Sequence, residues 1–294
     1  MRFLGRGGGL TSVTGGTYEI NDLLLHHAQI GYTMKHASVL GAQIAFSLAK
    51  INNKRAFVVN PVTVDEKEEI SRITGIKGIY NKSIFHALNQ KEVALQYSKS
   101  LGKKYEDLNL IVVHMGGGIS VGAHKNGKII DVNNALNGDG PMAPTRTGKI
   151  PAIDLIDMCY SGEYSKEDMV ELITQKGGLV SHLGTSDLRD VVKMIENGDK
   201  YAELIYNAMI YQIAKEVGAT STVLKGKVDA IILTGGMAKD NTLVEKLKEY
   251  ISYIGDIVLI PGEEEMQALS NGALRVLRGE EKALEYTGKP VYEV

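Results

Sequence analysis

The sequence predicts an α/β protein in which mixed β-sheets are flanked by helices and the chain forms two lobes. Three short apolar runs, each of the length of a buried strand, alternate with segments of helical periodicity; the runs are residues 108–114, 228–234 and 256–260. The chain has 294 residues, which is long for a single hydrophobic core. This alternation and this length together favour two packed lobes.

The first hundred or so residues contain four segments with the pattern of a regular element. They are a short strand within the Gly- and Thr-rich residues 1–22, helical periodicity over 22–49, a buried strand over 55–60 and a helix over 83–101. The helical periodicity is interrupted near Gly31. Ser83 is suited to cap the start of the fourth segment, and Gly102 stands just past its end.

The rest of the chain begins with a buried strand and a hairpin. After the strand 108–114, residues 121–132 contain Asn126-Gly127, the strongest short hairpin signal. After the hairpin, three helices are expected to begin at residues 153, 166 and 187. Three more are expected to cover 200–225, 241–253 and 263–278. The resulting order, β-β-β-α followed by β-α-β, resembles that of the lobes of the actin, Hsp70 and sugar-kinase superfamily.

Composition excludes several classes of protein. The formal net charge of −2 gives no electrostatic reason to expect nucleic acid or an anionic membrane as partner. Cys159 is the only cysteine, so an internal disulfide is impossible and a reducing compartment is expected. The N-terminus has no signal-peptide core, and no apolar run approaches the ~18 residues of a membrane span. A cytoplasmic enzyme is therefore expected.

Two glycine clusters follow predicted strands. Gly116, Gly117 and Gly118 come after the first of these strands, where freed backbone N–H groups can hold phosphate oxygens at close range. No Gly-Lys-Ser/Thr follows, so the cluster is not a Walker A loop. Gly235-Gly236 joins a strand to a helix, a geometry that suits the ribose or phosphate edge of a nucleotide.

Three charged or titratable residues stand in unusual surroundings. Arg146 lies in a loop with no amphipathic helix to explain it, and Arg6 is embedded among glycines. The planar guanidinium of arginine can donate two parallel hydrogen bonds to a carboxylate or phosphate. His86 stands on the predicted helix directly after Phe85. A lone histidine of this kind is more often structural than functional.

The whole chain resembles the acetate and butyrate kinases, and the match to the butyrate kinases is close. The segments that show the resemblance are Gly5–Gly8, Lys35–Ser38, Ser83–Lys91, His114–Ser120, Asp131–Asn134, Leu233–Gly236 and Arg275–Glu281. It implies the two-lobed, actin-like ATPase fold and transfer of the γ-phosphoryl group of ATP to a small aliphatic carboxylate, reversibly, with Mg²⁺. A homo-oligomer, dimeric or higher, is also implied.

The resemblance assigns roles residue by residue. Arg6 and Arg146 match the arginines that hold the carboxylate and the moving phosphoryl group, His86 matches a donor to equatorial phosphoryl oxygens, and Asn60 stands at a catalytic aspartate position. The residues implied to bind the substrate are Gly7, Gly8, His36 and Phe85. Those implied to bind the nucleotide are His114, Gly116, Gly117, Gly118, Asp187, Arg189, Gly235 and Gly236. Glu264 matches the Mg²⁺-associated glutamate, with Glu263 and Glu265 as alternatives.

The resemblance also suggests a domain division and a substrate. The expected division is a carboxylate-side lobe formed by 1–62 with 265–294, and a nucleotide-binding lobe over 63–264. Gly7 and Gly8 stand where acetate-specific relatives carry bulkier apolar residues, which is expected to leave room for butyrate or a branched short-chain acid. Each methylene discriminates by only ~1–3 kcal/mol, so substrates are expected to overlap.

Two departures from the family pattern matter. The chain begins at a segment that is internal in its relatives, without their N-terminal strands and Asn-x-Gly-Ser-Thr-like phosphate loop. We therefore expect exposed apolar surface on the helix at 36–49 and a poorly paired strand at 55–60. Asn60 replaces an aspartate and cannot act as a base, and nothing in the sequence shows that Asp65 or Glu66 takes over.

Three hypotheses remain open from the sequence. In the first, the chain is an active carboxylate kinase whose missing piece is supplied by an N-terminal extension or another chain. In the second, it is a truncated relative that binds nucleotide with little turnover. In the third, it is a non-catalytic partner of a full-length paralogue.

Overall fold

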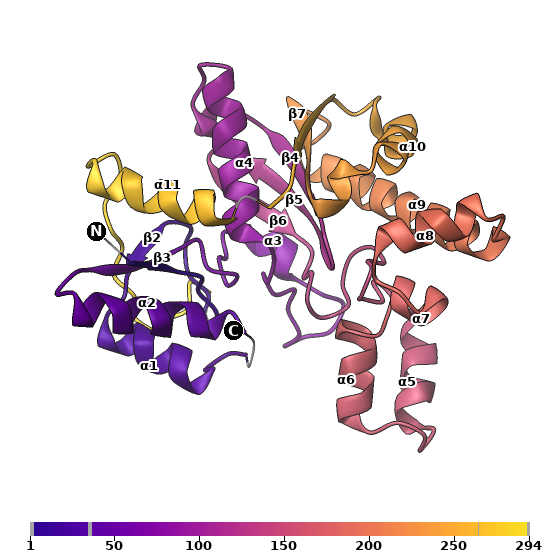
Figure 1. Cartoon of the computed structure of the whole chain (residues 1–294), viewed down its shortest axis with the longest axis horizontal. Coiled ribbons are helices and arrows are strands. Elements are labelled where there is room, and N and C mark those ends of the chain that lie inside the picture. Colours follow the sequence, from indigo (N-terminus) through magenta and orange to yellow (C-terminus); the bar gives the residue numbers. More distant parts are fainter. Residues whose placement is uncertain (1–2, 35–36, 264, 293–294) are drawn as a thin grey trace. The chain divides into compact units, whose positions relative to one another are not determined.

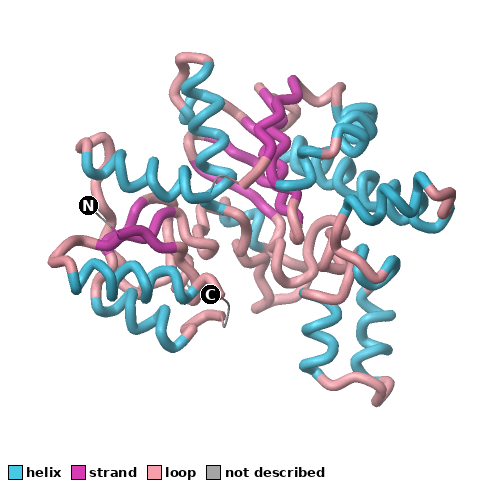
Figure 2. Tube along the Cα trace, viewed as in Figure 1, coloured by secondary structure: helices cyan, strands magenta, loops and turns pink. Residues whose placement is uncertain are grey.

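The computed structural model describes residues 3–34, 37–263 and 265–292, and the chain divides into two compact units (Figures 1 and 2). The first unit comprises Met1–Glu106, Gly127–Asp131 and Glu264–Val294. The second comprises Asp107–Asn126 and Val132–Glu263. In this division residues 63–106 belong with the N-terminal segment, whereas the sequence places them in the other lobe. The boundaries of independently stable domains stay a prediction.

The first unit contains a three-stranded sheet in the order β1-β3-β2. Its strands are β1 (Phe3–Gly5), β2 (Thr17–Glu19) and β3 (Ala56–Val59). β3 pairs with β1 in parallel and with β2 in antiparallel orientation. The expectation that this strand is poorly paired is therefore wrong, because two short strands within residues 1–22 satisfy both of its edges.

Helices cover both faces of this small sheet (Figure 1). α2 (Val39–Ile51) packs on one face and is backed by α1 (Asp22–Ile30), and α11 (Glu265–Leu277) packs on the other. Gly31, with φ 59°, ends α1 in the left-handed conformation, which explains the break in helical periodicity. On its outer face α2 exposes four apolar side chains, as expected from the sequence: Leu40, Ile44, Leu48 and Ile51.

The remaining helices of the first unit are α3 (Glu69–Arg72) and α4 (Ala87–Ser100), which is followed by the 3-10 turn η1 (Tyr105–Asp107). α4 begins four residues later than expected, with His86 at the N-cap position. Ser83 does not cap the helix because its hydroxyl donates to the Val64 carbonyl, 2.7 Å away. Gly102, with φ 64°, follows the end of the helix as predicted.

The second sheet is mixed, in the order β6-β5-β4-β7-β8. Its strands are β4 (Leu110–Met115), β5 (Ile119–Lys125), β6 (Lys128–Val132), β7 (Ala230–Gly235) and β8 (Asp256–Pro261). β4, β7 and β8 are parallel, and β5 runs antiparallel to β4. Asn126 and Gly127 both have positive φ at the turn between β5 and β6, which confirms the predicted hairpin.

In the second unit, α9 (Lys200–Val223) packs against β4 and β5. α9 is contacted by α7 (Leu179–Leu183), α8 (Leu188–Glu196) and α10 (Asn241–Ile251). α5 (Ala152–Tyr160) and α6 (Lys166–Thr174) extend from the rest of this unit (Figure 1), and α5 has no buried residue. Mixed sheets flanked by helices are thus confirmed.

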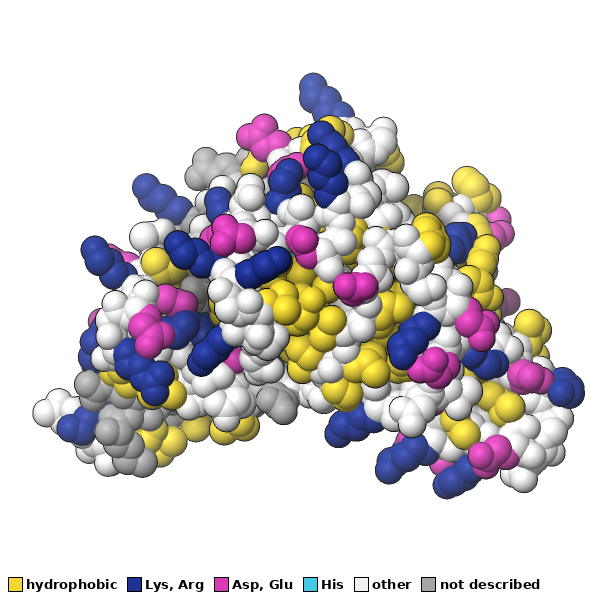
Figure 3. Space-filling model, turned by 90° about the horizontal axis from the view of Figure 1, so that it is seen from above, with side chains coloured by type: hydrophobic (Ala, Val, Ile, Leu, Met, Phe, Trp, Pro, Cys, Tyr) yellow, Lys and Arg dark blue, Asp and Glu magenta, His cyan; other side chains and the backbone are white. Residues whose placement is uncertain are grey.

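Two features of the structure concern the classes that the composition argues against, nucleic-acid-binding and membrane proteins. Acidic and basic side chains are interspersed on the face seen in Figure 3, without a large region of one sign. None of the helices in the described part of the chain combines the length and the apolar character that a bilayer crossing requires.

Candidate active site

In the second unit, three parallel strands end at the same edge of the sheet. β4 is followed by Gly116–Gly118, β7 by the 3-10 turn η2 (Gly236–Lys239), and β8 by Gly262 and Glu263. Ligands of α/β proteins bind outside the carboxyl ends of the strands, because loops and helix N-termini converge there. The loops after these strands are therefore the first place to look for a site.

A groove lies at this edge, with about 1790 Å³ of open space. Without the open solvent at its mouth, the groove has a cavity volume of about 1020 Å³, at the upper end of the ~300–1,000 Å³ of small-molecule pockets. The groove brings together five of the eight residues expected to bind nucleotide: Gly116, Gly117, Asp187, Arg189 and Gly236. The N-termini of α8 and α10 also open into it, at Leu188 and Asn241. Backbone N–H groups at helix N-termini favour anionic ligands.

Gly235 and Gly236 have different structural reasons to be glycine. Gly235 has φ 89°, and a Cβ atom there would lie 2.3 Å from the Met115 carbonyl oxygen. It also exchanges two backbone hydrogen bonds with Gly262, at 3.0 and 2.9 Å, which ties the loops after β7 and β8 together. A Cβ atom on Gly236 would meet nothing within 4 Å. Gly235 therefore shapes the loop, whereas Gly236 presents bare backbone to the groove.

Arg146 lies against the first glycine cluster rather than among the groove-lining residues. A Cβ atom on Gly118 would overlap the Arg146 guanidinium, at 1.3 Å from Nη1. The neighbouring Thr145 fixes this loop by donating its N–H and its hydroxyl to the Gly117 carbonyl, at 3.2 and 2.9 Å. Burial lowers the pKa of Arg146, and its Nε has no hydrogen-bond partner among the described residues. A desolvated cation with an unsatisfied donor is stabilised by an anion.

Asp187 and Arg189 form an exposed pair at the start of α8. The Asp187 carboxylate accepts from the Arg189 N–H at 2.9 Å and caps the helix, and it accepts from the Arg189 side chain at 2.6–3.1 Å. These hydrogen bonds lower the pKa of Asp187 to about 2. The carboxylate is therefore ionised at neutral pH and holds the guanidinium at the rim of the groove.

His114, Gly118 and Gly235 are not among the residues that line the groove. His114 is 1% exposed, and its Nε2 lies 3.8 Å from the carboxylate of Glu263. Of the three glutamates considered for Mg²⁺, Glu263 lines the groove and Glu265 pairs with Arg6. Glu264 lies outside the described residues.

The first unit has a separate small pocket whose cavity volume is about 10 Å³, room for about one water molecule. It brings together Arg6, Asn60 and His86, which the resemblance predicts to be catalytic, and Gly7, which it predicts to bind the substrate. The rest of its lining is largely apolar: Val59, Pro61, Val62, Ala87 and Leu88, together with the polar Asn89. A cation and hydrogen-bonding groups beside an apolar wall suit a small molecule with a charged end and an alkyl end.

Local hydrogen bonds place the polar side chains of this pocket. Asn60 follows β3 with φ 38°, a conformation that asparagine tolerates. Its Oδ1 accepts from the Gly16 N–H at 2.8 Å, and its own N–H donates to the Gly16 carbonyl at 2.9 Å. His86 follows a segment held to the preceding loop by Phe85, whose N–H donates to the Val62 carbonyl at 3.3 Å. Arg6 pairs with Glu265 at 2.9 Å.

Gly7 and Gly8 do not leave the open space expected from the sequence. A Cβ atom on Gly7 would lie 2.4 Å from Val58 Cγ1, and one on Gly8 would lie 1.9 Å from Ser38 Oγ. The chain's own side chains fill that space, so the expected extra room at these glycines is wrong. Phe85 is 4% exposed and does not line the pocket, and His36 lies outside the described residues.

Asp65 and Glu66 are engaged in buried ion pairs. Asp65 pairs with Arg72, and Glu66 pairs with Lys91 at 2.9 Å. Glu66 also accepts from the Gly15 and Ile129 N–H groups, at 3.0 and 2.9 Å. Removing one partner of such a pair leaves a buried charge uncompensated. Both carboxylates are therefore structural, and neither lines the pocket that contains Asn60.

Several lining residues were missed by sequence reasoning. In the groove these include Lys193, Met237, Lys239, Asp240 and Asn241, and in the small pocket Val62, Leu88 and Asn89. Lys239 had a usable signal, because it stands three residues after Gly236 at the end of a strand. Leu88 and Asn89 had none, since which face of α4 turns toward the pocket depends on tertiary packing.

Comparisons with known proteins give a family and several similar structures. The sequence model of the Acetokinase family matches residues 76–258. The structure is similar to an acetate kinase from Porphyromonas gingivalis (TM-score 0.79, 22% identity, covering 92% of this chain and 76% of that one). It is also similar to a propionate kinase from Francisella tularensis subsp. tularensis SCHU S4 (TM-score 0.74, 21% identity, 90% and 76% covered) and to an acetate kinase from Entamoeba histolytica (TM-score 0.79, 18% identity, 94% and 79% covered).

These neighbours confirm the actin-like ATPase fold. The family model covers more than half of the chain, including the glycine loop after β4, the N-terminus of α8 and the Gly235-Gly236 turn. The chain belongs to the acetokinase family.

Proposed function

We propose that this chain is a short-chain carboxylate kinase that transfers the γ-phosphoryl group of ATP to a small aliphatic acid. A carboxylate oxygen forms the new O–P bond, the bond between phosphorus and the β–γ bridging oxygen breaks, and ADP leaves with that oxygen. The observation that carries the proposal is the small pocket in which Arg6, Asn60 and His86 stand beside five apolar side chains. A cation for the carboxylate and an apolar wall for its alkyl group suit this substrate class.

The groove of the second unit supplies the proposed nucleotide site. Bare backbone at Gly116, Gly117 and Gly236 and the N-termini of α8 and α10 offer donors to phosphate oxygens. The Arg146 guanidinium, buried against Gly118, provides a positive charge for the transferring group. In-line transfer requires the acceptor oxygen to stand next to the γ-phosphoryl group.

Mg²⁺ fits the donor chemistry of the groove. Protein-bound Mg²⁺ usually keeps several waters and takes one or two carboxylates together with substrate phosphates. No cluster of three or more acidic, His or Cys ligands occurs among the described residues, so a metal carried by the nucleotide suits this chain better than a dedicated cage. We propose Glu263, the described glutamate that lines the groove, as its carboxylate partner. The metal would neutralise charge on the β- and γ-phosphates.

The proposed acid is butyrate or a branched short-chain relative. The support is the apolar wall formed by Val59, Pro61, Val62, Ala87 and Leu88 rather than the glycines after Arg6. Since each methylene contributes only ~1–3 kcal/mol, acetate and propionate are expected to react more slowly rather than not at all. A homo-oligomer and a cytoplasmic location belong to the same proposal.

Trapping the acyl phosphate as a hydroxamate tests the reaction with ATP, Mg²⁺ and butyrate. His86→Ala should lower kcat by about 10²–10³-fold and change the KM for ATP far less, because a donor to the transferring phosphoryl group acts in the transition state. His26→Ala, on the exposed face of α1, is the matched control and should leave kcat unchanged. Unchanged kcat in His86→Ala would remove His86 from the mechanism.

A second candidate function, nucleotide binding with little turnover, is favoured by Asn60. Its amide is uncharged where an aspartate is expected beside Arg6 and His86. Asn60→Asp keeps the oxygen that accepts from the Gly16 N–H and adds only the charge. A gain in hydroxamate formation with unchanged folding would identify the missing charge as the defect. No gain, together with ADP-dependent thermal stabilisation, would support a binding protein.

A further inference from the structure

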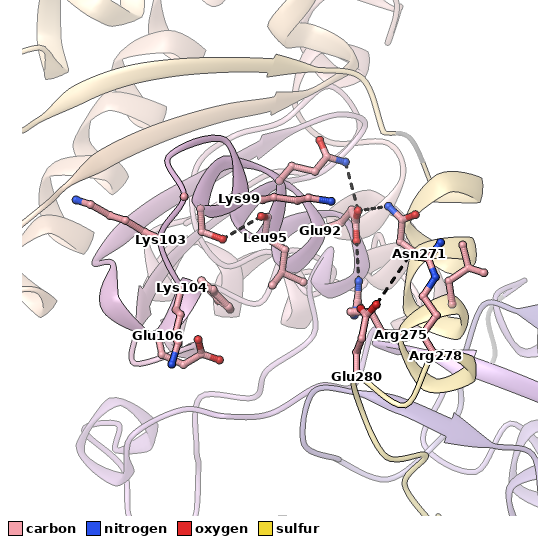
Figure 4. Close-up of a pocket in the computed structure, with 15 residues that line it drawn as sticks. Glu92, Leu95, Lys99, Lys103, Lys104, Glu106, Asn271, Arg275, Arg278 and Glu280 are labelled. Carbon is pink, nitrogen blue, oxygen red and sulfur yellow. Dashed lines mark hydrogen bonds and ion pairs between the residues drawn. The ribbon is translucent and has the colours of Figure 1, made fainter.

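A separate pocket lies in the first unit between α4, the loop that follows it, and α11 (Figure 4); we call it the α4–α11 pocket. It has a cavity volume of about 500 Å³ and contains none of the residues assigned to catalysis. Glu92 on α4 fastens its two walls together. The Glu92 carboxylate accepts from Asn271 on α11 and lies 3.5 Å from Nη1 of Arg275, also on α11.

The charges that line this pocket leave a positive excess. Five cations face three carboxylates: Lys99, Lys103, Lys104, Arg275 and Arg278 against Glu92, Glu106 and Glu280. Arg275 is paired with Glu92 and with Glu281, and Arg278 lies 3.9 Å from Glu280.

The three lysines, by contrast, form no ion pair with any residue in the described ranges. They stand at the end of α4 and on the loop after it, and Figure 4 shows Lys103 and Lys104 on the side of the pocket away from the arginines. Glu106 balances one of these charges, and Glu281, the second partner of Arg275, leaves the surroundings of the pocket with an excess of one positive charge.

The size and the apolar part of the pocket narrow the ligand further. Leu95 and Leu274 line it from opposite helices, so a purely inorganic ion would leave apolar surface in contact with water. Lysine ammonium groups are common partners of phosphate. We propose that the α4–α11 pocket is an effector site for a small phosphate monoester that has an apolar group.

Both walls of this pocket begin at residues of the proposed carboxylate site. α4 starts directly after His86, and the first residue of α11, Glu265, pairs with Arg6 at 2.9 Å. A ligand that binds one spacing of the two helices better than another shifts the population toward that spacing. It thereby changes where His86 stands relative to Arg6. This coupling rests on the proposed function, whereas the binding itself does not.

Calorimetric titration with phenyl phosphate tests the binding. The variant Lys99→Gln/Lys103→Gln/Lys104→Gln should bind about tenfold or more weakly than the unaltered chain, because charge-assisted hydrogen bonds are lost. The matched control is Lys54→Gln/Lys77→Gln/Lys82→Gln, which removes three exposed lysines of the same unit that form no ion pair with a described residue. It should bind normally. Inorganic phosphate should bind the unaltered chain more weakly than phenyl phosphate.

Three outcomes of this titration would overturn the site. If both triple-lysine variants bound phenyl phosphate with equal affinity, the three lysines of the pocket would not contact the ligand. If the unaltered chain bound inorganic phosphate as tightly as phenyl phosphate, the apolar contact would not contribute. Gly236→Val, which adds a side chain to the nucleotide groove, should retain phenyl phosphate binding. Loss of binding in this variant would place the ligand in that groove instead.

The effector role is tested by kinetics. Saturating phenyl phosphate should change the KM for butyrate by about fivefold or more in the unaltered chain and in the control, and not in the pocket variant. Binding without any change of KM in an active enzyme would overturn the effector role. A chain with no kinase activity would still bind phenyl phosphate, so failure of the proposed function gives a different result.

Discussion

At the scale of single residues, adjacent glycines in the candidate nucleotide site are expected to differ in their tolerance of a methyl group. Gly235→Ala should lower the free energy of unfolding by about 1–3 kcal/mol or more, because the residue has φ 89° and its Cβ would lie 2.3 Å from the Met115 carbonyl oxygen. Gly236→Ala meets no atom within 4 Å and should stay within about 0.5 kcal/mol. Urea denaturation measures both changes.

The same pair separates folding from binding. Although Gly236→Ala folds normally, its methyl group replaces bare backbone at the groove and should weaken ADP binding. Gly218→Ala is the control, because Gly218 lies on α9, has open space at Cβ and does not line the groove. Equal destabilisation by Gly235→Ala and Gly236→Ala would contradict the assigned backbone roles.

The Asp187–Arg189 pair predicts an acid-range titration. The pKa of Asp187 is lowered from 3.8 to about 2, chiefly by side-chain hydrogen bonds from Arg189. A carboxyl group whose pKa is lowered by folding stabilises the fold above its unfolded pKa, and this contribution is lost as the pH falls through about 2. Arg189→Gln should return the pKa toward 3.8, as measured by carboxyl-carbon NMR titration. An unchanged pKa would show that the pair does not form.

At the scale of secondary-structure elements, α2 presents two contrasting faces. Ile44 is 58% exposed, whereas its neighbour Ala45 is 2% exposed within the core that α2 forms with α1 and the small sheet. Ile44→Lys should therefore change stability by less than about 0.5 kcal/mol. Ala45→Leu should destabilise by about 1–3 kcal/mol, because a larger side chain overfills a packed core. Thermal and urea denaturation measure both changes. If Ile44→Lys destabilised the protein more than Ala45→Leu, the assigned orientation of α2 would be wrong.

Elements governed by local chemistry could be predicted from the sequence. Periodicity located α9 and the buried strands, Asn126-Gly127 located the hairpin, and the exposed side of α2 was anticipated. What depends on distant partners could not be predicted. The pairing of β3 on both edges requires two strands of three residues each, which are too short for a periodic signal. Ser83 has the residue type of a cap, but the Val64 carbonyl takes its hydroxyl.

The residues of the candidate sites likewise fall into those that the sequence predicts and those that it does not. The glycine turns, Arg6 and His86 were anticipated from residue type and family resemblance, and the structure gathers them into a groove and a pocket within their respective units. The space beside Gly7 and Gly8 was misjudged, because a sequence does not show that Val58 and Ser38 fill it. Leu88 and Asn89 line the small pocket only because of how α4 is oriented, which the sequence does not show.

At the scale of the whole molecule, the division into two compact units predicts how a nucleotide stabilises the chain. Every residue of the proposed nucleotide groove belongs to the second unit, and every residue of the small pocket belongs to the first. A ligand stabilises the part of a protein that binds it, by about 2.7 kcal/mol at a free concentration one hundred times its dissociation constant. ADP with Mg²⁺ and no carboxylate should therefore act on the second unit alone.

Scanning calorimetry and hydrogen exchange together measure this expectation. Two unfolding transitions should be resolved, and Mg²⁺–ADP should raise the midpoint of one while the other stays in place. Exchange should slow at residues 116–118, 186–193 and 235–241, which line or support the groove, and not in α1 and α2. Gly236→Val should abolish both effects while retaining both transitions. A single transition that moves as a whole would contradict independent units, because nucleotide binding would then be coupled to the stability of the entire chain.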